Sequence, residues 1–165
     1  MVKLGRKINQ APKLLPNTYR DTLTYQLGHW IEYTQSPATH QIQQIKFKVT
    51  DCLGNCPIFD ITIQANGKAH YHAIKDHLRK GHFTSQLTLS HLAQIKALLN
   101  YIHFPQLKDV YPNQDIAQMT TELSIRYDQG KVKTIKNTTL GGTQGLAHLY
   151  QLLINLRTNQ HWQPH

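Results

Sequence analysis

Two cysteines that stand four positions apart are the residues of this 165-residue chain most able to do chemistry. Cys52 and Cys56 have Gly54 between them, and Pro57 follows directly. A disulfide fits this spacing, because the Cα atoms of a bridged pair lie only about 4.4–6.8 Å apart. We therefore expect a disulfide-capable turn shaped by Gly54 and Pro57. Inert thiols, thiol redox chemistry and a metal site remain the alternatives.

Two of these alternatives, a metal site and thiol redox chemistry, need further ligands or a helix that the sequence does not clearly supply. A structural zinc site takes about four ligands, so Cys52 and Cys56 would need His70 and His72, which share one face of a predicted strand. A redox pair is usually C-x-x-C at the start of a helix, where the helix dipole lowers the thiol pKa. Here the spacing is longer and a strand follows. No cofactor is expected, and these four residues are the candidates for a metal.

Motifs of enzymes are missing from the sequence. It has no closely paired carboxylates, no G-x-S-x-G, no P-loop and no H-E-x-x-H. A cysteine and a histidine could form a nucleophilic pair, but eleven histidines make such a pairing available by chance. We therefore predict a protein without enzymatic activity.

The charge of the chain is strongly positive, with 18 Lys and Arg against 9 Asp and Glu. Such a balance favours acidic partners. Seven residues are predicted to form a cationic surface: Lys46, Lys48, Lys68, His70, His72, Arg79 and Lys80. Sheets that bind nucleic acid usually expose aromatic side chains on that same face, whereas Phe47, Phe59 and Tyr71 alternate toward the opposite face. An acidic protein is therefore the predicted partner. Nonspecific nucleic-acid binding and a merely solvated surface are the alternatives.

Alternating apolar residues predict the strands that hold these positions. In the first half, strands are expected at 44–50, 57–63, 68–74 and 81–88, with a hairpin turn at Asn66-Gly67. A helix capped by Thr88 or Ser90 follows and ends before Phe104. The second half repeats this plan with strands at 119–127 and 131–137, a helix capped by Thr143, and Trp162 as a terminal anchor.

The fold predicted from these elements is α+β, with two successive β-hairpin–helix units that form an antiparallel sheet and pack their helices on one face. Residues 1–17 are expected to be a flexible basic arm, and 18–165 a single domain with halves at about 42–104 and 118–162. Leu23, Leu27, Trp30 and Ile31 fall at helical spacing and predict an amphipathic helix at 18–33, although GHWIEYT could instead form a strand.

The segment CLGNCP matches a Cys-x-Gly-x-Cys-Pro signature. It resembles a bacterial domain family of unknown function in which this signature lies between two early strands, and the resemblance covers roughly residues 42–162. The matching positions are Cys52, Gly54, Cys56, Pro57, Gly67, Tyr71, Gly81, Phe104 and Trp162. The resemblance implies a fold but no activity. Members of the family often look exported or lipid-anchored, which implies an oxidised cysteine pair.

The N-terminal residues lack the apolar stretch of a secretory signal, and no apolar run reaches the roughly 18 residues that span a bilayer. As written, the sequence predicts a cytoplasmic protein, and a periplasmic or exported one if a leader has been removed from it.

Overall fold

Alternating apolar side chains build one large sheet, on which two helices pack. The structure is a computed structural model that describes residues 22–51, 56–112, 119–138 and 140–165. The strands of the sheet are β3 (Ile42–Asp51), β4 (Ile58–Gln64), β5 (Lys68–Lys75), β6 (Gly81–Gln86), β7 (Val110–Tyr111), β8 (Thr120–Tyr127), β9 (Lys131–Asn137) and β10 (Gln163–Pro164). The helices are α1 (Leu89–Tyr101) and α2 (Gln144–Asn159), with a short 3-10 turn, η1 (Phe104–Gln106), after α1.

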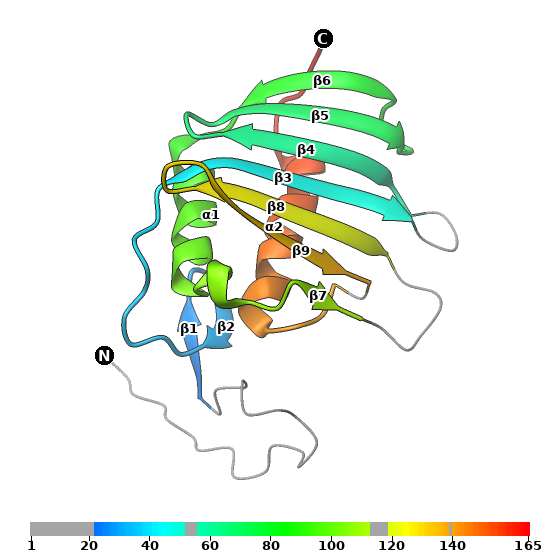
Figure 1. The fold of residues 1–165 in the computed structure, drawn as a ribbon. Helices are drawn as coiled ribbons and strands as arrows, with labels where there is room; N and C mark the ends of the chain where they lie inside the picture. Colours follow the sequence, from blue (N-terminus) through cyan, green and yellow to red (C-terminus); the bar gives the residue numbers. More distant parts are fainter. Residues whose placement is uncertain (1–21, 52–55, 113–118, 139) are drawn as a thin grey trace.

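The eight strands lie in the order β10-β6-β5-β4-β3-β8-β9-β7. Figure 1 shows the part of this order from β6 to β7. All neighbours are antiparallel except β7, which runs parallel to β9. The central strand β3 pairs with β4 on one side and with β8 on the other. The two halves of the chain therefore share one continuous sheet through β3.

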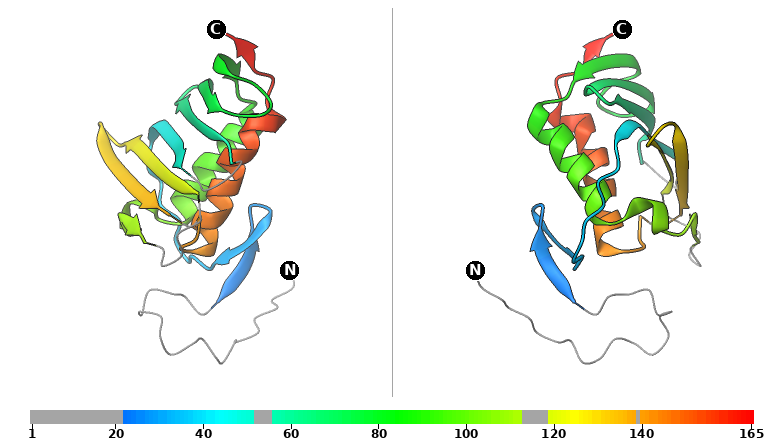
Figure 2. Two further views of the ribbon diagram at one scale, coloured as in Figure 1. Left: turned by 90° about the vertical axis from the view of Figure 1, so that its right-hand side faces the viewer. Right: turned by 60° about the vertical axis from the view of Figure 1, so that its left-hand side comes forward.

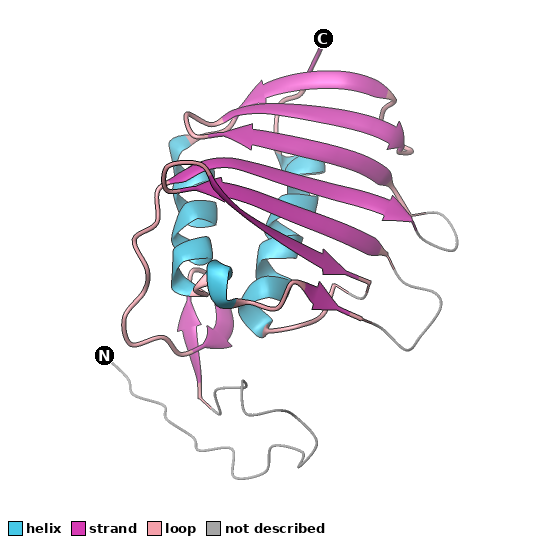
Figure 3. Ribbon diagram, in the orientation of Figure 1, coloured by secondary structure: helices cyan, strands magenta, loops and turns pink. Residues whose placement is uncertain are grey.

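Both helices cover the same face of the sheet, so the domain has two layers (Figures 2 and 3). The core lies between these layers: Phe47 on β3 stacks on Tyr150 of α2, with ring centres 5.7 Å apart, and both side chains are fully buried. Each helix begins at a predicted cap. Thr88 accepts a hydrogen bond from the His91 backbone N–H, and Thr143 accepts one from that of Leu146.

The predicted helix at 18–33 is wrong, because these residues include a β-hairpin instead. Strands β1 (Leu23–Gln26) and β2 (His29–Glu32) pair antiparallel around a two-residue turn. Leu27 and Gly28 in this turn have φ angles of 53° and 87°, and two successive positive φ angles match the twist of a tight hairpin. The alternative strand assignment for GHWIEYT is the correct one.

The hairpin docks on the start of α2. The Glu32 carboxylate accepts hydrogen bonds from the backbone N–H groups of Gln144, at 2.5 Å, and Gly145, at 3.0 Å. These N–H groups have no partner within the helix, and the positive end of the helix dipole favours a carboxylate there. At the other end of the hairpin, the Leu27 carbonyl accepts a hydrogen bond from the Gln94 side chain on α1. The hairpin therefore joins both helices.

The α+β class is confirmed, whereas the chain order is less regular than two hairpin–helix units. Helix α1 follows a four-stranded meander, β3 to β6, and α2 follows only β8 and β9. The connection between the halves contains η1 and β7. Trp162 is buried, as predicted, and its Nε1–H donates to the Leu156 carbonyl at 2.9 Å. This anchor holds β10 beside β6.

Candidate interaction surface on the open face of the sheet

The sheet has an open face on the side away from α1 and α2. Figure 1 looks onto this side, with the helices behind the strands. Side chains of alternate residues project from it, and the strand register arranges them in three rows across the sheet. We name each row after its residue on β3: the Gln44 row, the Lys46 row and the Lys48 row.

The Lys48 row carries both signs of charge. Its members, from β6 to β9, are His82, His72, Asp60, Lys48, Glu122 and Lys136. The Glu122 carboxylate lies 3.8 Å from the Lys136 ammonium, and that of Asp60 lies 3.2 Å from His72 Nδ1. The His72 and His82 rings stack with centres 4.0 Å apart. Acidic and basic groups thus largely neutralise each other along this row.

The other two rows contain no carboxylate. The Lys46 row consists of Thr84, His70, Thr62, Lys46, Ser124 and Thr134. The Gln44 row consists of Gln86, Lys68, Gln64, Gln44, Arg126 and Val132. Their cations Lys46, Lys68 and Arg126 are exposed. Hydroxyl and amide groups surround these charges, so the two rows can offer hydrogen-bond donors to an anion.

Five of the seven predicted cationic residues lie on the open face: Lys46, Lys48, Lys68, His70 and His72. Arg79 and Lys80 lie in the connection between β5 and β6. The Arg79 guanidinium is 5.6 Å from the centre of the Phe83 ring, which packs against the core side of the sheet. Arg79 therefore does not join the rows.

Sequence reasoning missed Arg126 and Lys136 as members of this surface. The alternation in 119–127 predicts that Arg126 points away from the core. It does not predict that β8 pairs with β3, which is what brings Arg126 beside the other cations. That pairing joins segments about eighty positions apart, so no local pattern reveals it. The prediction that Phe47, Phe59 and Tyr71 face the core is confirmed, since all three are buried. The three rows contain no Phe, Tyr or Trp.

The cysteine turn falls largely outside the described residues, which exclude Cys52 and Gly54. Cys56 and Pro57 are half-buried just before β4. The disulfide between the two cysteines therefore stays a prediction. His70 and His72 do project from one face of β5, yet among the described residues no group of three potential ligands is placed to hold a metal ion.

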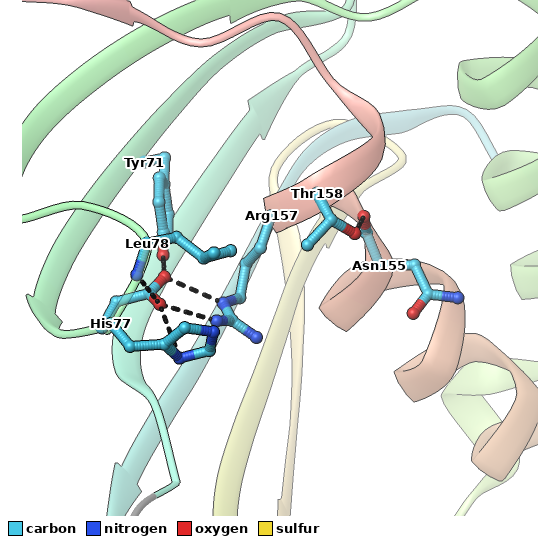
Figure 4. Close-up of polar contacts among 7 residues, drawn as sticks. Tyr71, His77, Leu78, Asn155, Arg157 and Thr158 are labelled. Atoms are coloured by element: carbon cyan, nitrogen blue, oxygen red, sulfur yellow. Dashed lines mark hydrogen bonds and ion pairs between the residues drawn. The ribbon is translucent and has the colours of Figure 1, made fainter.

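A second polar cluster is buried where β5 ends and α2 passes over the sheet. Asp76, whose side chain is fully buried, accepts hydrogen bonds from Arg157 Nε at 3.1 Å and from an Arg157 terminal nitrogen at 2.8 Å. The Tyr71 hydroxyl donates to the same carboxylate, and the Leu78 backbone N–H does so at 3.1 Å. Figure 4 shows Tyr71 and Arg157 converging from the sheet and the helix.

The charges of this cluster are held by mutual contacts. Burial alone would raise the pKa of the Asp76 carboxyl, but the hydrogen bonds from Arg157 and Tyr71 outweigh it and lower that pKa to about 2. Burial and the hydrogen bond to Asp76 raise the pKa of Tyr71 to about 12. A fully buried carboxylate with its charge already paired offers nothing to a substrate. We therefore interpret this cluster as a structural pin between α2 and β5.

A family model for a domain of unknown function (DUF6438) matches residues 43–157. The chain belongs to this family. The DUF6438 region begins in β3 and ends at Arg157 in α2, so it contains all three rows of the open face and the Asp76 cluster. The β1–β2 hairpin and β10 lie outside it. The expectation of a family of unknown function is thus confirmed over nearly the expected range.

No curated protein matches the DUF6438 chain. Neither of the two helices that the structure describes is long and apolar enough to cross a membrane.

Proposed function

We propose that this protein is a binding module without enzymatic activity, and that the open face of its sheet binds an acidic protein. One observation carries the proposal: the three rows hold five Lys and Arg side chains against two carboxylates, on the face that α1 and α2 leave uncovered. Electrostatic complementarity of this kind raises association rates and selects partners by charge.

The absence of aromatic side chains from the three rows favours an acidic protein over a nucleic acid. Single-stranded nucleic acids gain affinity by stacking bases on exposed rings, and the large aromatic residues of these strands point into the core. Lysine, hydroxyl and amide groups on the open face suit the carboxylates of a protein surface or segment instead.

The test is fluorescence anisotropy with a labelled, glutamate-rich dodecapeptide, and with a glutamine-rich peptide of equal length as the control. We expect binding of the acidic peptide only, with an affinity that falls at least tenfold between 50 and 300 mM NaCl, because salt screens exposed charges. Equal binding of both peptides, or tighter binding of single-stranded DNA of the same charge, would refute the proposal.

For the cysteine turn we propose a structural disulfide between Cys52 and Cys56. The pairing of Val49 with Phe59 closes β3 and β4 into a hairpin, which brings the two ends of the connection between them together. Intact mass with and without a reductant tests this, since reduction adds two hydrogen atoms. Free thiols in an unreduced sample without metal would instead leave inert thiols or the thiol-redox alternative, and stoichiometric zinc would support the metal-linked one.

A further inference from the structure

Charge is distributed unevenly over the open face, and a pocket lies at one edge of it. Together these two features indicate where an acidic partner docks. We propose that the partner's acidic segment lies across the Lys46 and Gln44 rows and places a carboxylate in a polar pocket beside Lys68. This inference rests on the proposed function and specifies its site.

The first support is the segregation of charge by row. Both carboxylates of the three rows, Asp60 and Glu122, lie in the Lys48 row, where each has a cationic or imidazole neighbour within 4 Å. An incoming carboxylate would meet repulsion there and compete with existing ion pairs. In the Lys46 and Gln44 rows it meets Lys46, Arg126 and Lys68 without a competing acid.

The second support is a pocket of about 530 Å³ at the corner where β6, β10 and the end of α2 meet. No Asp or Glu is among its lining residues, which include Lys68, Thr84, Gln86, Gln160, His161 and Gln163. The ammonium, hydroxyl and amide groups of this set can all donate hydrogen bonds. The pocket thus offers several hydrogen-bond donors to a carboxylate.

The pocket and the acid-free rows form one continuous surface. Thr84 belongs to the Lys46 row, and Lys68 and Gln86 belong to the Gln44 row, while all three line the pocket. Lys68 therefore belongs both to an acid-free row and to the pocket lining, which are two independent observations. An extended acidic segment could cross β8, β3, β4 and β5 over these rows and end in the pocket.

The experiment compares matched charge removals in the full chain, with the glutamate-rich dodecapeptide as the probe. Lys46→Gln and Lys68→Gln remove one charge each from the acid-free rows, while Lys48→Gln and Lys136→Gln remove one charge each from the Lys48 row. All four side chains are exposed on strands of the same sheet, so net charge and folding are matched. We expect at least a fivefold loss of affinity for the first two variants and less than a twofold loss for the other two.

The possible outcomes separate this inference from the proposed function. If wild-type protein binds the peptide and all four variants weaken it equally, the acidic partner stands and the docking site is refuted. If Lys46→Gln weakens binding but Lys68→Gln does not, the pocket is refuted. If wild type fails to bind the peptide, or a sulfated oligosaccharide or RNA displaces it at far lower concentration, the acidic protein itself is refuted.

Discussion

At the scale of single residues, Asp76 stabilises the fold through a carboxylate that is charged although its side chain is fully buried. We predict that Asp76→Asn lowers the free energy of unfolding by about 3–5 kcal/mol, since removing one member of a buried pair leaves the Arg157 guanidinium without its counter-charge. Urea unfolding followed by circular dichroism measures the effect.

The matched control for this prediction is Glu122→Gln on the open face. Its carboxylate also faces a cation, Lys136, but at 3.8 Å and with both side chains partly exposed to solvent. Exposed pairs contribute only about 0–1 kcal/mol. Similar losses in the two variants would show that Asp76 is not a buried structural pin.

The same carboxyl predicts how acid affects the fold. Its pKa falls from an ordinary value of 3.8 to about 2 in the folded protein. A carboxyl whose pKa is lowered in the folded state stabilises the protein at pH values above its unfolded-state pKa. This contribution is lost as the pH falls toward the folded-state pKa. We expect wild type to lose about 2 kcal/mol of stability from this group between pH 4 and pH 2. Asp76→Asn should lack this part of the acid dependence, which unfolding curves at several pH values would reveal.

At the scale of elements, the close packing of the start of α2 against the end of α1 depends on Gly145. A Cβ atom at this position would lie 2.4 Å from Ile102 Cγ2. Alanine is a better helix former than glycine by about 1 kcal/mol, but overpacking costs about 1–3 kcal/mol. We predict that Gly145→Ala lowers the thermal midpoint despite its higher helix propensity.

A double-mutant cycle provides the control for this prediction. Ile102→Ala removes the atom that a new Cβ would meet, so Gly145→Ala should become neutral or stabilising in that background. Additive effects of the two substitutions would contradict the steric explanation.

The elements that sequence predicted best are those with local signals. Alternation identified β3, β4, β5, β8 and β9. The cap of α2 was predicted as Thr143, and that of α1 as Thr88 or Ser90, of which Thr88 is the cap. The β1–β2 hairpin was missed because its turn has the sequence Leu27-Gly28, which is not a usual hairpin signal. Leu27 has a positive φ angle, which leucine rarely adopts. The part of the open face on β3 to β5 was predictable from alternation. Arg126 and Lys136 were not, because their place depends on the non-local pairing of β3 with β8.

At the scale of the whole molecule, Trp162 anchors β10, which covers the β6 edge of the sheet. Its ring lies 5.1 Å from that of Tyr71, and its burial holds β10 against β6. We predict that Trp162→Ala releases β10, exposes the edge of β6 and promotes self-association, since an unpaired edge strand can pair with another chain. Size-exclusion chromatography with light scattering would detect the larger species. Trp162→Phe, which keeps a ring, should stay closer to wild type, and equal association of both variants would contradict this explanation.

The central place of β3 also determines the order in which the sheet can assemble. Strands β3 to β6 are joined by short connections, whereas Ile45 on β3 meets Ile125 on β8, eighty positions further along the chain. Closing a long loop costs more entropy and slows folding. We therefore expect the β3–β6 meander to form early and the capture of β8 to limit the folding rate. Until β8 pairs with β3, one edge of β3 is free to pair with the β3 edge of a second, partly folded molecule.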